Sequence, residues 1–238
     1  YEQLHFDDKN KITENFYTLI EWDTPRTTRT LKDLMERRFS VLLGNEKHQT
    51  VAWNELFDES QEMPGHQDKY RFITDRTFLR PRDIIKFSNE VLAVNKRRTA
   101  STCTQNSQTT GRFTNEDVHQ AREGYGRYFQ REIDDEIHKH VPHYEKYLEL
   151  LKGISVYRFN KERFAEEFKS RSAIMPEGSS PNGILRQLFE FSVLGFYSRG
   201  GRGFGGSQYI FRYKDPSHEF DETAELFQVH LGLIDILG

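Results

Sequence analysis

The chain has 238 residues, with 34 Lys and Arg against 37 Asp and Glu, so its net charge is −3 and gives no overall attraction for nucleic acid. Its content of charged (30%) and aromatic (13%) residues excludes a disordered protein, and no apolar run is long enough to cross a membrane. The single cysteine, Cys103, excludes an intrachain disulfide and a cysteine zinc site. We therefore expect a cytoplasmic globular protein, and because it begins with Tyr1 we expect it to be processed or excised from a longer polypeptide.

The first third of the chain predicts short helices. Residues 1–24 have no clear period, whereas apolar residues at helical spacing predict a helix over 25–43, ending near Gly44. A short helix is expected at 53–57. The segment 68–78 then leads to Pro81, which starts a helix that we expect to run to about Asn95, with Ile84, Ile85, Phe87, Val91 and Leu92 on its apolar face.

Two arginines, Arg80 and Arg82, flank Pro81 at the start of this helix. A helix N-terminus carries a partial positive charge, so each arginine there is disfavoured by about 0.3–1 kcal/mol, and Asp83 offsets only part of this. Two interpretations stay open with about equal weight. The arginines and the first backbone N–H groups either receive a phosphate or pair with carboxylates elsewhere in the fold.

The middle of the chain predicts a polar connector and two helices. Residues 99–110 are almost wholly polar and short-chained, which is typical of an exposed connector. Thr114, with Asp117 three residues later, predicts a capping box. The long helix that follows has one apolar stripe, formed by Val118, Ala121, Tyr125, Phe129, Ile133 and Ile137. After Pro142 a second helix is expected to end at Gly153.

The last third predicts a winged helix-turn-helix. Asn160 caps one helix, and Ser180 followed by Pro181 starts another. A glycine-rich tip then leads into a strand over 208–213, so we expect a β-hairpin wing at about 197–214. The wing cations Arg199, Arg202, Arg212 and Lys214, with Arg186 and Gln187 on the preceding helix, are candidate contacts to DNA phosphates or to a partner. Because that helix reads as apolar nearly all round, we favour a protein partner.

No motif in the chain indicates catalysis by itself. There is no phosphate-binding loop, and no Gly-Lys pair occurs at all. His138, His140 and His143 could suggest zinc, but residues two apart on a helix point to different sides, and no Cys or well-placed carboxylate completes an i, i+4 pair. Asp134 and Asp135 are expected on a solvated helix face. The sequence therefore predicts neither a catalytic residue nor a metal site.

Two blocks of the chain resemble a known family. The segment "YRFITDRTFLRPRDIIKFSNEVL" (70–92) resembles the region after the nucleotide-binding core of prokaryotic AAA+ and STAND-like P-loop ATPases of uncharacterised, defence or signalling type. The segments 193–216 and 227–238 are similar to the winged-helix region that ends such chains. The resemblance implies that Arg82 takes the place of the second nucleotide sensor, whereas Arg80 stands where those relatives have a small residue.

These observations predict a mostly α fold with a small β-hairpin, in which a helical lid (1–110) precedes long helices and a winged helix (111–238). The resemblance implies a regulatory, nucleotide-sensing part of a P-loop ATPase, with ATP and Mg²⁺ held by an upstream core or a neighbouring protomer and none in this fragment. The alternative is a winged-helix DNA-binding or transcriptional regulator without ATPase activity.

Overall fold

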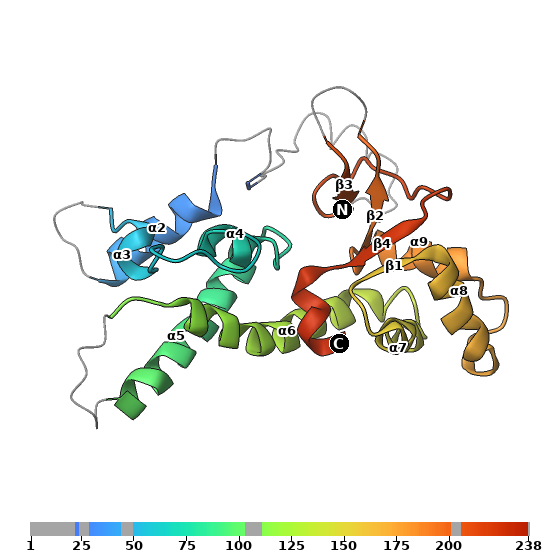
Figure 1. Cartoon of the computed structure of the whole chain (residues 1–238), viewed down its shortest axis with the longest axis horizontal. Helices are drawn as coiled ribbons and strands as arrows, with labels where there is room; N and C mark the ends of the chain where they lie inside the picture. Colours follow the sequence, from blue (N-terminus) through green and yellow to red (C-terminus); the bar gives the residue numbers. More distant parts are fainter. Residues whose placement is uncertain (1–21, 24–28, 44–49, 103–110, 201–205, 238) are drawn as a thin grey trace, which may run out of the picture.

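The computed structural model describes residues 22–23, 29–43, 50–102, 111–200 and 206–237. The described part is mostly helical and also contains a four-stranded antiparallel sheet. The sequence predicted the mostly helical class and a β-hairpin, which forms part of this sheet. Figure 1 shows helices α2–α5 at one end, the sheet at the other, and α6 running between them. No helix among the described residues has the length and apolarity needed to cross a membrane.

The first helices pack around a cluster of aromatic side chains. Helix α2 (Leu31–Leu42) begins at Thr30, whose side chain accepts a hydrogen bond from the Asp33 N–H, and α3 (Trp53–Leu56) and α4 (Lys69–Thr74) follow. The rings of Trp53 and Phe57 stack at 3.8 Å between centroids. Helix α2 starts later than the predicted range 25–43, because Thr30 caps it. Residues 24–28 and 44–49 lie outside the described part.

Helix α5 (Pro81–Thr102) is longer than predicted, because the first residues of the expected polar connector continue it. Neither Gly nor Pro interrupts the segment, so the helix can continue through Thr99, whose hydroxyl donates to the Asn95 carbonyl at 2.9 Å. Residues 103–110 lie outside the described part. Helix α6 (Asn115–Ile137) packs along α5, so the boundary that the sequence indicated at residue 110 falls between two packed helices.

Helix α6 has the capping box and the buried stripe that its sequence predicts. The Thr114 hydroxyl accepts from the Asp117 N–H, the Asp117 carboxylate accepts from the Thr114 N–H at 2.9 Å, and all six stripe residues are buried. Helix α7 (Tyr144–Ile154) follows and ends at Ser155 in the left-handed conformation. It is the first helix of the C-terminal unit.

The C-terminal unit has the element order of a winged helix. Strand β1 (Arg158–Asn160), α8 (Lys161–Ser170), η2 (Ser172–Ile174) and α9 (Pro181–Glu190) precede β2 (Leu194–Ser198), β3 (Gln208–Ile210) and β4 (Leu226–Val229). The caps at Asn160 and Ser180 are confirmed. The sheet has the order β1-β4-β2-β3, and β2 pairs with β3 antiparallel, with Tyr197 opposite Tyr209, which confirms the hairpin.

Three details of this unit differ from the sequence prediction. Strand β3 ends at Ile210 rather than Tyr213, and β1 and β4 were not predicted. Helix α9 is amphipathic rather than apolar all round, because Phe191, Val193 and Leu194 come after its end, while Arg186, Gln187 and Glu190 are exposed. The exposed residues of α9 therefore form one polar face.

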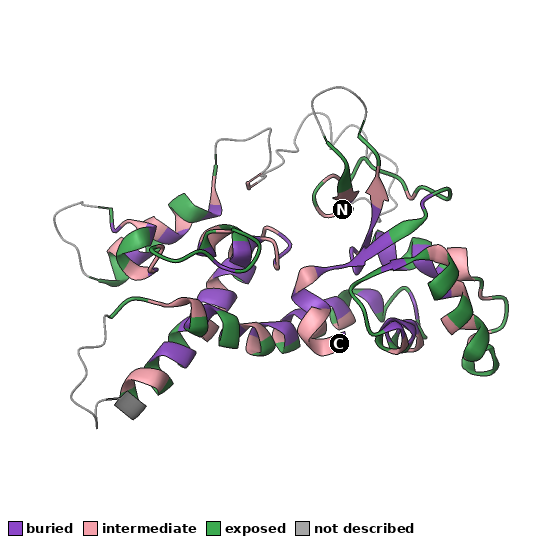
Figure 2. Cartoon of the chain, viewed as in Figure 1, coloured by how far each residue is buried: buried purple, intermediate pink, exposed green. Residues whose placement is uncertain are grey.

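The C-terminal segment joins the helices to the sheet. After β4, η3 (Leu231–Leu233) and α10 (Ile234–Leu237) pack on α6, and α10 also contacts α7. Gly232 makes this close approach possible, because a Cβ there would lie 2.5 Å from the Arg76 carbonyl oxygen. Figure 2 shows buried residues from the sheet through this segment to α6, so one core serves both parts.

Candidate functional site

The Arg80–Pro81–Arg82 turn is the sequence-predicted site, and the structure holds its backbone in one shape. Leu79 adopts the left-handed conformation (φ 54°), which costs a non-glycine residue about 1–2 kcal/mol. Just before it, the Phe78 N–H donates to the Asp83 carboxylate at 3.2 Å, and the Leu79 N–H donates to the Thr77 hydroxyl at 3.2 Å. The strain and these hydrogen bonds fix the backbone just before the two arginines, and therefore the direction in which their side chains start.

Both arginines reach carboxylates on α6. Arg82 Nη2 lies 2.6 Å from Glu132 Oε2 and 3.8 Å from Glu136 Oε1, and Arg80 Nη1 lies 3.1 Å from the same Glu136 oxygen. The two glutamates are four residues apart and occupy the last two turns of α6. In the structure, therefore, carboxylates elsewhere in the fold supply the negative charge that the helix start requires.

Asp83 supplies a further negative charge on the buried side of the turn. Its side chain is 2% exposed, and burial raises the pKa of this carboxyl, against the opposing effect of Arg80, the Phe78 N–H and Arg82. Because Asp83 is buried and already accepts a hydrogen bond, it cannot move to balance a ligand. The Arg82–Glu132 pair is the more exposed part of the turn.

The ion pairs of the turn are open to water. Arg82 is 52% exposed and Glu132 26%, and exposed pairs of this kind contribute about 0–1 kcal/mol. Displacement of Glu132 from Arg82 by a competing anion would therefore cost the protein little stability. The arrangement can hold a negative charge.

Two of the described wing cations pair with carboxylates on other elements. Arg212 Nε lies 3.1 Å from Glu190 on α9, and Lys214 Nζ lies 3.9 Å from Asp75 after α4. Arg199 is exposed, and Arg202 lies outside the described residues. Arg186 on α9 pairs with Glu222. The exposed face of α9 thus carries paired charges, which reduces its attraction for nucleic-acid phosphates.

The histidines and aspartates weighed in the sequence also have clear positions. His138, His140 and His143 are exposed at the junction of α6 and α7. Asp134 is half-buried rather than solvated, and burial raises the pKa of its carboxyl against the opposing effect of Tyr144 of α7. Among the described residues no three His, Cys, Asp or Glu side chains are grouped as metal ligands.

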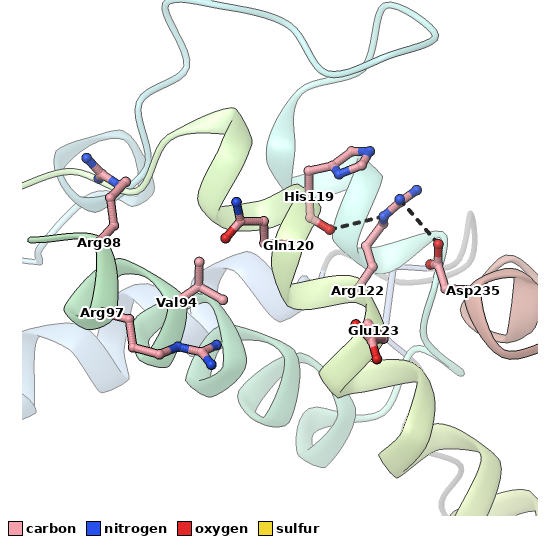
Figure 3. A pocket seen from close by; sticks show the side chains of 8 residues that line it. All are labelled: Val94, Arg97, Arg98, His119, Gln120, Arg122, Glu123 and Asp235. Atoms are coloured by element: carbon pink, nitrogen blue, oxygen red, sulfur yellow. Dashed lines mark hydrogen bonds and ion pairs between the residues drawn. The ribbon is translucent and has the colours of Figure 1, made fainter. Parts of the chain in front are cut away.

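A basic pocket that sequence reasoning missed lies at the other end of the α5–α6 pair (Figure 3). Its lining includes Arg97 and Arg98 from α5, His119 and Arg122 from α6, and Asp235 from α10. Arg122 Nε donates to the His119 carbonyl at 3.1 Å, and Nη2 lies 3.2 Å from Asp235. Arg97 follows Arg82 by 15 residues, about 22 Å along the helix, so this pocket is separate from the arginine turn.

Asp117, beside that pocket, accepts hydrogen bonds from two residues of α5. This buried carboxylate accepts from Arg98 Nε at 2.8 Å, Arg98 Nη2 at 2.9 Å and Asn95 Nδ2 at 3.0 Å. Burial alone would raise the pKa of Asp117, but Arg98, the Thr114 N–H and Asn95 together lower it. The capping-box pattern identified Asp117 as a cap, and no local signal identified Arg98 as its partner.

The fold and the turn define a helical region with a charged turn, joined to a unit with winged-helix order. Residues 29–134, which include Arg80, Arg82 and Glu132, match the family model of the FunZ-associated C-terminal helical domain. That description names a position and a helical fold and states no activity. Searches of curated proteins and of solved structures gave no match.

Proposed function

We propose that the chain is the C-terminal regulatory part of a cytoplasmic P-loop ATPase, in which Arg82 exchanges between Glu132 and a phosphate of bound ATP. The observation that carries the proposal is the Arg82–Glu132 pair: Nη2 and Oε2 are 2.6 Å apart, yet the arginine is 52% exposed. ATP and Mg²⁺ would be held by an upstream core or by a neighbouring protomer. The chain contributes the sensor and no catalytic residue.

Charge favours the exchange. A phosphate carries more negative charge than a carboxylate and forms two parallel hydrogen bonds with guanidinium. At the start of α5 it would also face backbone N–H groups and the positive end of the helix dipole. The Glu132 carboxylate carries a single charge and contacts the Arg82 guanidinium.

The exchange would reach the C-terminal unit through α6. Glu132 and Glu136 lie in the last two turns of α6 and contact the arginine turn, and Asp134 in the same turns lies beside Tyr144 at the start of α7. Helix α7 is the first helix of the winged-helix unit. Release of Glu132 would therefore remove a contact that holds the end of α6, which leads into α7. The nucleotide state would in this way be coupled to the position of the winged-helix unit.

The matching family model also supports the proposal. Its description is of a C-terminal helical domain, and a domain of that position fits a region that follows a catalytic core. The alternative, a DNA-binding regulator, has less support because Arg186 and Arg212 are paired with Glu222 and Glu190. A protein partner for the winged-helix unit agrees better with those pairings.

The test is Arg82→Ala in the natural protein that contains this chain. The proposal predicts that ATP turnover falls about ten- to a thousandfold, or about 1.4–4 kcal/mol in the barrier, while the melting temperature stays unchanged. Arg127→Ala is the matched control, because Arg127 is exposed and pairs with Glu123 on its own helix. A lower melting temperature with normal turnover would show that the Arg82 pairs are purely structural.

A further inference from the structure

A second hollow lies on the winged-helix unit, between the end of α7, the segment that leads into β1, and α10. It encloses about 390 Å³ and is lined by Leu151, Ser155, Val156, Tyr157, Arg158, Val229, Ile234 and Leu237. Six of these eight residues are apolar or aromatic. Its volume is near the lower end of the roughly 300–1,000 Å³ found for ligand pockets, enough for one large side chain.

The rim of the hollow exposes apolar surface. Val156 is 45% exposed and Tyr157 is 43% exposed, although they lie in the chain between two buried residues, Ile154 and Phe159. Exposed apolar residues that surround a hollow favour a partner that covers them. The described part of the chain provides no segment that does so.

Arg158 adds a fixed positive charge to this rim. Its Nε donates to Gln228 Oε1 at 2.8 Å, and its guanidinium carbon lies 5.2 Å from the Tyr157 ring centre and 5.1 Å from that of Tyr209. Within the described ranges no carboxylate lies within 4 Å of it. Arg158 is thus held in place without a counter-charge, which suits a carboxylate from outside.

Strand β1 offers backbone groups at the same place. The Val229 N–H donates to the Tyr157 carbonyl at 2.8 Å and the Lys161 N–H donates to the Glu225 carbonyl at 2.9 Å, so residues 157, 159 and 161 face β4. The N–H and C=O of Arg158 therefore point away from β4. Because β1 is the edge of the sheet, they can pair with an added extended chain.

We propose that this hollow binds an extended segment of a partner protein that carries a large apolar residue beside Asp or Glu. The apolar side chain fills the hollow, the carboxylate pairs with Arg158, and the backbone pairs with the edge of β1. Nucleic acid fits less well, because phosphates need several cations and Arg158 is the one charged residue in the lining. A fatty acid could not use the backbone groups of β1.

The test is a fluorescence-polarisation screen of short end-capped peptides, with Leu or Phe beside Asp in a Thr and Val background, against this chain. We expect at least one peptide to bind with a Kd below about 1 mM. Arg158→Gln should weaken that binding about tenfold, and Asp→Asn in the peptide should weaken it equally, with no additional loss when both changes are combined. Arg199→Gln, which removes another exposed arginine of the unit, should leave the Kd unchanged.

Three results would overturn the proposal. The first is the absence of binding by every peptide at about 1 mM, and the second is an equal effect of Arg158→Gln and Arg199→Gln. The third is binding of laurate or of single-stranded oligothymidylate that Arg158→Gln weakens while the peptides do not bind. Circular dichroism of both variants confirms that the fold is kept, as expected because both arginines are exposed.

Discussion

Acid should destabilise the junction between the helices and the sheet, because His230 is buried there as a neutral imidazole. His230 is 1% exposed, and its ring lies 4.8–5.1 Å from the rings of Phe78, Phe129 and Tyr213. Its Nδ1 accepts a hydrogen bond from the Gly232 N–H at 3.1 Å. Burial, with Lys214 and Arg76 nearby, lowers the pKa of His230 to about 3 from its usual 6.5.

The size and sign of the effect follow from this pKa. Above pH 6.5 the imidazole is neutral in both the folded and the unfolded chain, so the full stability is present. As the pH falls from 6.5 towards 3, only the unfolded chain takes up the proton, and each pH unit lowers the free energy of unfolding by about 1.4 kcal/mol. Between pH 6.5 and 5, where most carboxylates stay ionised, the loss is about 2 kcal/mol.

Urea unfolding followed by circular dichroism at several values between pH 7 and pH 5 measures this loss. His230→Gln keeps a neutral acceptor near Gly232 and should unfold more easily at pH 7 but with a nearly flat pH dependence. His119→Gln, which replaces an exposed histidine, should keep the wild-type slope. An equal slope in the wild type and in His230→Gln would refute the assignment.

Four further predictions concern other parts of the molecule. Asp117→Asn should lower the free energy of unfolding by about 1–3 kcal/mol in urea titration, because the buried carboxylate loses its charge in the hydrogen bonds from Arg98 and Asn95, whereas exposed Asp135→Asn should have little effect. Gly232→Ala should cost about 1–3 kcal/mol because its Cβ would meet the Arg76 carbonyl and the Phe129 ring, whereas Gly111→Ala meets no atom within 4 Å, and equal costs would contradict this. Nucleic-acid binding should be weak and should fall steeply with added salt in a filter-binding assay, because most of the described wing and α9 cations are paired. Tight, salt-resistant binding to one sequence would reverse the preference for a protein partner. The isolated chain should hydrolyse no ATP, and turnover lost on mutation of one of its own carboxylates would contradict this.

Local signals in the sequence predicted the helices well. The caps at Thr114, Asn160 and Ser180 and the stripe of α6 depend on residues within a few positions of one another, so the pattern contains all the information needed. Helix α5 exceeded its prediction because threonine and serine are poor rather than forbidden helix residues. Packing of α6 along α5 then decides how far the helix continues.

Long-range partners could not be predicted from one sequence. Strands β1 and β4 have three and four residues, and Phe159 pairs with Phe227, far along the chain. Likewise, the charge conflict at Arg80 and Arg82 was visible in the sequence, but their partners lie about 50 residues later on α6. The sequence identified the turn as unusual, and only the fold identified Glu132 and Glu136.

The most direct test of the exchange at Arg82 is the ATP affinity of Glu132→Gln in the natural protein that contains this chain, measured by isothermal titration calorimetry. If Glu132 competes with phosphate for Arg82, its neutralisation removes an exposed ion pair of up to about 1 kcal/mol, and the Kd for ATP should fall about two- to fivefold. Glu123→Gln, which affects only the pair with Arg127, should leave it unchanged. An unchanged or weaker affinity in Glu132→Gln would contradict the account.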